Sequence, residues 1–240
     1  VEIDFRAELA ATADAVHVMA ATAVEELTEL YPLPQDRIVV VAHPAYHAAY
    51  PQYVQQPDAR LRLGIDQDRL VIAVPGAIRP YKHIDLLHAA LRAAGSPAHL
   101  LVAGEPGPDT GELIEGLRAD AHVSVITRRL SDREMSELII AADLVSSIYG
   151  SPISSGAAAL ALTLGRAVLA PDRRSSREQY GDAAIDSTTD PERLARTLAG
   201  LDRSDLHQRG QAARQIAAER RSAPTAFARA ITDLLGAKQA

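Results

Sequence analysis

The sequence predicts an α/β fold with a doubly wound parallel sheet, preceded by a partial α/β segment. Apolar runs of strand length alternate with helical patterns along most of the 240 residues, which is the order of repeated β-α-β units. Several of these runs lead at once into small or basic residues, as the carboxyl ends of parallel strands do at ligand sites. The chain is also long enough to bury a sizeable core.

The first 57 residues predict a short α/β segment that ends in a linker. The expected elements are a helix over 3–12, a strand over 15–19, a helix over 21–30 and a strand over 37–41. Residues 46–57 carry tyrosines and prolines without an apolar period, so we place the domain boundary near Asp58. The segment is too short for a complete sheet, and the chain begins with Val1 rather than methionine. We therefore expect it to be the tail of a domain whose beginning is absent.

The alternation restarts beyond this boundary and predicts a Rossmann-like domain over residues 58–218. Strands are expected over 70–74, 98–103, 123–126, 144–148 and 167–170, and helices over 84–94, 109–117, 132–142, 157–164 and 191–201. Ser131 and Glu134 have the spacing of a capping box, which marks a helix start. The segment 219–240 contains a final helix.

Composition and motifs exclude several function classes. Acidic residues outnumber basic residues 31 to 25, so no overall positive field favours nucleic acid or an anionic membrane. The chain has no cysteine, which suits the cytoplasm, and no apolar run approaches the roughly 20 residues of a bilayer span, so any membrane attachment is peripheral. Asp66 and Asp68 form a carboxylate pair before a strand, and the sequence offers no cluster of metal ligands, so no metal site is predicted. P-loop, dinucleotide and serine-elbow motifs are absent.

Small residues at the start of the helix over 157–164 predict a phosphate site. Ser154, Ser155, Gly156 and Ala157 follow a strand and open this helix. The N–H groups of a first helical turn lack intrahelical partners, and the helix dipole favours negative charge there. Glycine allows close approach, and serine can donate to phosphate or cap the helix. A plain helix cap at Ser155 is the alternative.

Two cations beyond the strand over 70–74 predict the other half of this site. Arg79 offers a planar fork and Lys82 a compact charge, unless the loop is an ordinary solvated turn. Arg128 and Leu130 follow another strand and are predicted to frame a nucleobase, with the arginine near ribose or phosphate; a charged surface turn is the alternative. His43 ends a strand beside a proline and can face an interdomain cleft.

Taken in order, these blocks resemble the two-domain GT-B-type glycosyltransferases, in particular the group 1 and exopolysaccharide-type enzymes. The matching blocks are residues 13–18, 38–44, 64–82, 140–143 and 165–171. Ala167 stands where the last block usually has proline, and the resemblance covers about residues 10–200. It implies that residues 1–57 are a remnant of the acceptor-side domain and that 58–218 bind the donor.

The resemblance implies a glycosyltransferase that takes its sugar from a nucleotide-diphosphate-sugar. Lys82 falls on the family's diphosphate lysine, and Arg79 is expected to replace the partner arginine, whose place Ala77 occupies. The family's paired glutamates fall on Pro152 and Leu160, so no carboxylate holds the donor's sugar there.

The start of the donor loop instead resembles the exopolysaccharide branch, with Tyr149 ahead of a serine–glycine pair, so Tyr149 joins the donor-binding set. Lys82, Arg79 and the N–H groups of 155–157 would meet the charge of the leaving diphosphate, with neither metal nor cofactor. A carbohydrate or small-molecule acceptor and the general base would lie on the missing half or a partner subunit, so we expect this chain alone to bind donor and transfer little or nothing. The alternatives are a non-catalytic nucleotide-sugar-binding subunit that completes a site in trans, and an epimerase on the same plan.

Overall fold

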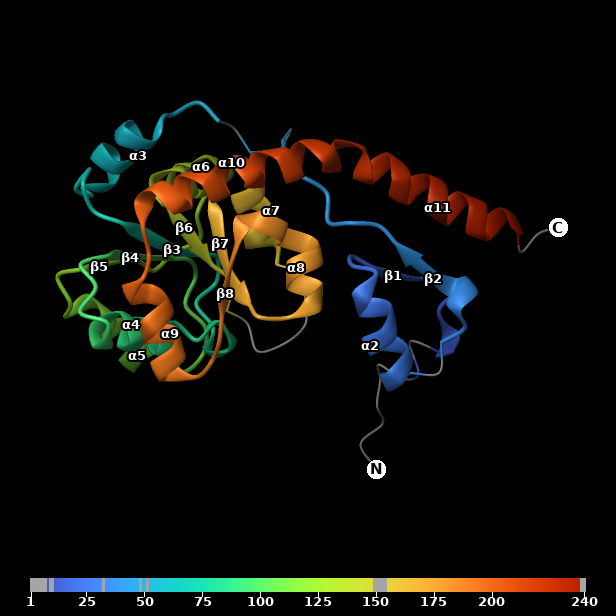
Figure 1. Cartoon of the computed structure of the whole chain (residues 1–240), viewed down its shortest axis with the longest axis horizontal. Helices are drawn as coiled ribbons and strands as arrows, with labels where there is room; N and C mark the ends of the chain where they lie inside the picture. Colours follow the sequence, from blue (N-terminus) through green and yellow to red (C-terminus); the bar gives the residue numbers. More distant parts are fainter. Residues whose placement is uncertain are drawn as a thin grey trace.

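Two parallel sheets organise the fold (Figure 1). The computed structural model describes residues 8, 11–31, 33–47, 49–50, 52–148 and 155–237. The smaller sheet pairs β1 (Val16–Val18) with β2 (Ile38–Val40), joined through α2 (Thr22–Leu30) and the short 3-10 helix η1 (Gln35–Arg37). The larger sheet has six strands, all parallel, in the order β5-β4-β3-β6-β7-β8. The predicted fold class is confirmed.

The large sheet reverses its strand order once, between β3 and β6. The strands are β3 (Val71–Pro75), β4 (His99–Ala103), β5 (Val123–Ile126), β6 (Leu144–Ser146), β7 (Ala167–Pro171) and β8 (Ala184–Ser187). The chain builds outward from β3 to β5, then returns to the other side of β3, where Ile72 pairs with Leu144 and Ala73 with Val145. Ligands of doubly wound sheets bind at such a reversal, outside the carboxyl ends of the strands.

Helices cover both faces of this sheet (Figure 1). One face packs against α4 (Ile84–Ala93), α5 (Gly111–Arg118) and α9 (Pro191–Ala199), and the other against α3 (Gln56–Leu63), α6 (Asp132–Ala141), α7 (Gly156–Thr163) and α10 (Arg203–Glu219). Because strand side chains alternate, Ile72 and Val74 enter the first core and Val71 and Ala73 the second. No helix in the described ranges is long and apolar enough to cross a membrane.

The small sheet is joined to the large domain by α8 (Arg174–Tyr180) and α11 (Ala223–Ala237). The carboxylate of Glu178 accepts the N–H groups of Ala21 at 2.5 Å and Thr22 at 2.9 Å, so α8 caps the start of α2. After α10 and η4 (Arg220–Ser222), α11 runs back toward β2, and the ring of Phe227 lies 4.8 Å from that of His17 (Figure 1).

Four elements lie where the sequence predicted none, namely α3, α8, β8 and α10; η3 (Gly181–Ala183) leads into β8. Helix α3 begins inside the expected linker and buries only Ala59 and Arg60, so it has no apolar period to detect. Helix α10 buries small residues such as Gly210 and Ala213 among polar ones. The capping box of α6 is confirmed, and the helix expected over 3–12 lies largely outside the described residues.

A buried ion pair fixes the start of the large sheet. Arg60 of α3 is 1% exposed and donates to Asp143 at 2.7 Å and to the carbonyl of Ala141 at 2.9 Å. Asp143 directly precedes β6 and also accepts the N–H of Val71, the first residue of β3, at 2.8 Å. The pair therefore holds α3, β3 and β6 in one arrangement.

Replacing Arg60 by leucine is expected to lower the free energy of unfolding by about 3–5 kcal/mol, because a buried carboxylate loses its partner. Arg62→Leu is the matched control, since the Arg62 side chain is 50% exposed in its pair with Glu137, and exposed pairs contribute about 1 kcal/mol or less. Urea unfolding measures both; equal losses would contradict the special role of Arg60.

Candidate functional site

The loop after β3 brings Lys82 back to the carboxyl end of that strand. Lys82 ends the 3-10 helix η2 (Pro80–Lys82), and its Nζ donates to the carbonyl of Pro75 at 2.6 Å. Gly76 permits this turn because its φ is +81° and a Cβ there would lie 3.3 Å from the Lys82 amine. The predicted lysine therefore lies at the carboxyl edge of β3, on one side of the strand reversal.

The amine of Lys82 is a buried cation without a counter-charge in the described part of the chain. The side chain is 5% exposed, and no carboxylate there pairs with it. Burial, with a smaller contribution from the positive charge of Arg79, lowers the pKa of Lys82 to about 8. The stretch 149–154, outside the described residues, contains no acidic residue in its sequence. An anionic ligand at this edge would remove the cost of burying the charge.

Arg79 ties the loops after β3 and β4 together. Its Nη1 donates to the carbonyls of Ile78 at 2.9 Å and Glu105 at 3.2 Å. Ile78 also bridges to Pro106, and a Cβ on Gly107 would lie 2.6 Å from the Arg79 guanidinium. Arg79 therefore lies near Lys82, with its Nη1 bound to backbone carbonyls, and its role toward a phosphate stays a prediction.

The start of α7 has the predicted cap. Ser155 is buried, and its hydroxyl accepts the N–H of Ala158 at 3.2 Å, so Ser155 is the N-cap residue. Helix geometry leaves the N–H groups of Gly156 and Ala157 without intrahelical acceptors, and Gly156 is exposed. Since α7 follows β6, this helix start belongs to the other side of the strand reversal. Ser154 and Tyr149 lie outside the described residues.

Tyr46, from the expected linker, packs against the start of α7 and was not predicted. A Cβ on Gly156 would lie 3.4 Å from the Tyr46 hydroxyl, and the Tyr46 N–H donates to Thr163 at 3.0 Å. His43 Nε2 lies 3.5 Å from the same hydroxyl, and the two rings are 5.4 Å apart. Burial raises the pKa of Tyr46. The one signal in the sequence was His43, three residues beyond β2, whose ring packs against that of Tyr46.

Arg128 and Leu130 follow β5, the outermost strand and two positions from β3. Arg128 is exposed and pairs at 2.5 Å with Glu134, which belongs to the capping box of α6. This arginine and Ser131 lower the pKa of Glu134 to about 2. Leu130 is half-buried against the core. The two residues share the carboxyl edge of the sheet, and the charge of Arg128 is paired within its own loop.

Leu160 and the Asp66–Asp68 pair, for which the sequence predicted no ligand or metal, have roles in packing and in a turn. Leu160, where the family's second glutamate would stand, is 3% exposed in the core, and Pro152 lies outside the described residues. Asp66 accepts the N–H of Asp68 at 3.0 Å in a tight turn. Within the described ranges, no group of three His, Asp or Glu side chains is placed to hold a metal ion.

The comparisons with known proteins bear on this architecture. No family model matches the chain. Over 99 residues it is 34% identical to the GDP-mannose:glycolipid 4-beta-D-mannosyltransferase of Xanthomonas campestris pv. campestris, covering 40% of this chain and 28% of that enzyme. HepE of Anabaena, solved with UDP and glucose, superposes with a TM-score of 0.75 and 16% identity over 95% of this chain and 65% of its own. Sucrose-phosphate synthase of Thermosynechococcus elongatus superposes with a TM-score of 0.76 and 17% identity. The match covers 98% of this chain and 60% of the synthase.

This is the GT-B glycosyltransferase fold. The resemblance drawn from the sequence blocks is thereby confirmed at the level of fold. The chain spans less than two thirds of each of these GT-B proteins and 28% of the mannosyltransferase.

The buried amine of Lys82 predicts a specific pH dependence of stability. Its folded-state pKa of about 8 lies below the ordinary value of 10.5, so the unfolded chain binds more protons between these pH values. The charged lysine therefore costs stability below pH 8, and this cost disappears as the pH rises toward 10.5. We expect the unfolding free energy of the wild type to gain up to about 3 kcal/mol relative to Lys82→Met over this window. Urea titrations at several pH values measure the difference, and a constant difference would contradict the assignment.

Proposed function

We propose that this chain forms the donor side of a glycosyltransferase and binds a nucleotide-diphosphate-sugar at the strand reversal. The observation that carries the proposal is the buried amine of Lys82, which lies at the end of β3 without a counter-charge among the described residues. The start of α7 supplies N–H groups from the other side of the reversal. The mannosyltransferase relative is named for GDP-mannose, and HepE was solved with UDP-glucose, which supports a donor of this class.

In the proposed reaction, the bond between the anomeric carbon and the diphosphate oxygen breaks, and the acceptor hydroxyl forms the new glycosidic bond. The electron pair of the broken bond stays on the diphosphate. Lys82 and the N–H groups of Gly156 and Ala157 would stabilise that growing charge, a contribution of about 2.7–4 kcal/mol for a comparable single donor. These groups supply the positive charge without a metal ion. The acceptor proton would pass to a base outside the described donor edge.

Tyr46, which contacts His43, extends the proposed site beyond the residues that would bind the diphosphate. The Tyr46 hydroxyl packs at Gly156, so it lies where the first-turn N–H groups would receive an oxyanion. A phenol there can donate a further hydrogen bond to the donor. We therefore include Tyr46 in the proposed site as a binding group contributed by the segment that precedes the large domain.

A non-catalytic nucleotide-sugar-binding subunit is the second candidate. The burial of Leu160 favours it, because the family's second carboxylate position belongs here to the core. An epimerase has no comparable support among the described residues. Binding and turnover separate the first two candidates.

The donor site is tested by calorimetry with UDP, GDP, UDP-glucose and GDP-mannose. Lys82→Met is expected to weaken diphosphate binding at least tenfold, because a hydrogen bond to a charged group contributes about 1.5–3 kcal/mol. Ser155→Trp should abolish it by filling the helix start. The chain has one other lysine, Lys238, so Lys238→Met is the matched control and should bind as the wild type does.

Unchanged affinity in both site variants would reject this location, and no binding by the wild type would reject both candidate functions. A sugar-transfer assay on the donor that binds then decides between them. Transfer from the donor to any offered acceptor supports the enzyme; tight binding without transfer, also in the presence of partner fractions, supports the subunit.

A further inference from the structure

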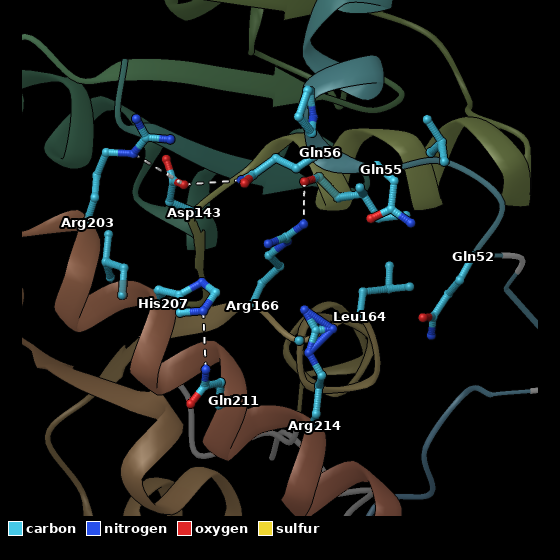
Figure 2. Close-up of a pocket in the computed structure, with 15 residues that line it drawn as sticks. Gln52, Gln55, Gln56, Asp143, Leu164, Arg166, Arg203, His207, Gln211 and Arg214 are labelled. Carbon is cyan, nitrogen blue, oxygen red and sulfur yellow. Dashed lines mark hydrogen bonds and ion pairs between the residues drawn. The ribbon is translucent and has the colours of Figure 1, made fainter. Parts of the chain in front are cut away.

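A cavity opens at the edge of the large sheet opposite to Lys82. It has a volume of about 440 Å³ and lies between the segment 52–57, the residues that precede β6 and β7, and α10 (Figure 2). Asp143 directly precedes β6, and Gly165 and Arg166 directly precede β7. In a parallel sheet all the amino ends of the strands lie at one edge. This cavity therefore lies at the amino ends of the strands and Lys82 at their carboxyl ends.

The lining of the cavity is cationic. Arg166, Arg203 and Arg214 line it, and Asp143 is its one lining carboxylate. That carboxylate already accepts hydrogen bonds from Arg60 at 2.7 Å and Val71 at 2.8 Å. Arg203 reaches it only at 3.9 Å. The Asp143 charge is therefore largely neutralised by Arg60, and the cavity keeps an excess of positive charge.

The donors of Arg166, which is half-buried, and of Arg214, which is exposed, differ in their surroundings. Arg166 donates from Nη2 to the carbonyl of Ile140 at 2.7 Å, but its buried Nε has no hydrogen-bond partner in the described structure. Burial, and then the charge of Arg214, lower the pKa of Arg166 to about 10, so the two guanidinium groups repel each other. No described carboxylate pairs with Arg214.

The guanidinium group of Arg214 packs against the backbone of a glycine. A Cβ on Gly165 would lie 2.5 Å from the Arg214 guanidinium carbon, and the φ of Gly165 is +67°. A side chain at position 165 would displace the arginine. The glycine thus admits the guanidinium at the cavity wall, beside Leu164 and across from His207 and Arg203 (Figure 2).

We propose that this cavity is an anion site that binds a phosphate group, with Arg166 and Arg214 as its principal donors. Guanidinium groups match phosphate oxygens with paired, charge-assisted hydrogen bonds. A bound phosphate satisfies the buried Nε of Arg166 and removes the repulsion between the two arginines. The side-chain amides of Gln52, Gln55 and Gln211 also line the cavity and add donors for the remaining oxygens. The site stands apart from the proposed donor site and does not depend on it.

The test is calorimetry and thermal unfolding of the whole chain in sodium phosphate, against sodium chloride of equal ionic strength and pH. We expect phosphate to bind the wild type and raise its melting temperature, as any ligand specific to the folded state does. Arg214→Gln should weaken binding at least tenfold. Arg221→Gln, a matched loss of one exposed arginine in η4, should leave it unchanged, and so should Lys82→Met. If Arg214→Gln does not fold, Arg203→Gln takes its place, since that side chain is 44% exposed.

Equal binding by the wild type and Arg214→Gln would overturn the proposal, as would loss of binding in Lys82→Met, which would place the phosphate in the donor site. Glucose 1-phosphate is the second probe. Tighter binding of inorganic phosphate supports a free-phosphate site, and tighter binding of the ester supports a phosphorylated metabolite. Failure of both probes to bind the wild type would also overturn the proposal.

Discussion

The hydrogen bonds of Asp143 are the constraint on which the large domain depends. Its carboxylate accepts from Val71 at the start of β3 and from the buried Arg60, while its own backbone leads into β6. These bonds align the two strands at the point where the sheet reverses its order. Parallel register then brings their carboxyl ends to one edge of the sheet, the edge at which Lys82 lies. The family-like block that ends in Asp143 thus has a folding role, and the proposed donor site at the opposite edge depends on it.

Buried positive charge is the common feature of both edges. The chain has a formal net charge of −6, yet the buried Lys82 on one edge and the half-buried Arg166 on the other lie where carboxylates are few, and the exposed Arg214 adds its charge beside Arg166. Such local fields are independent of net charge and attract compact anions over short distances. Overall composition argues against a polyanionic partner, but it carries no information about these two places.

The sequence predicted the elements whose apolar pattern and flanking residues agree, such as β3 with its basic loop and α6 with its capping box. It missed α3 and α10 because both are polar helices that bury small or charged residues, and their contacts exist only in the folded domain. The place of Lys82 could be predicted because its loop begins directly after a strand. Tyr46 could not, since its approach to Gly156 joins segments about a hundred residues apart. The cationic cavity was missed for the same reason, because Arg166 and Arg214 come together only through Gly165.

The cap that Glu178 places on α2 has a mechanical consequence. The carboxylate belongs to the large domain, and the amides it holds belong to the segment with the small sheet. Any hinge movement between the small-sheet segment and the large domain must first break the hydrogen bonds of this cap, at a cost of roughly 0.5–2 kcal/mol. The amides at the start of α2 would then be hydrated by water instead. The packing of α11 against the small sheet is a second connection between the two parts. The segment that carries Tyr46 to α7 is therefore attached to the large domain at two places, through Glu178 and through Phe227.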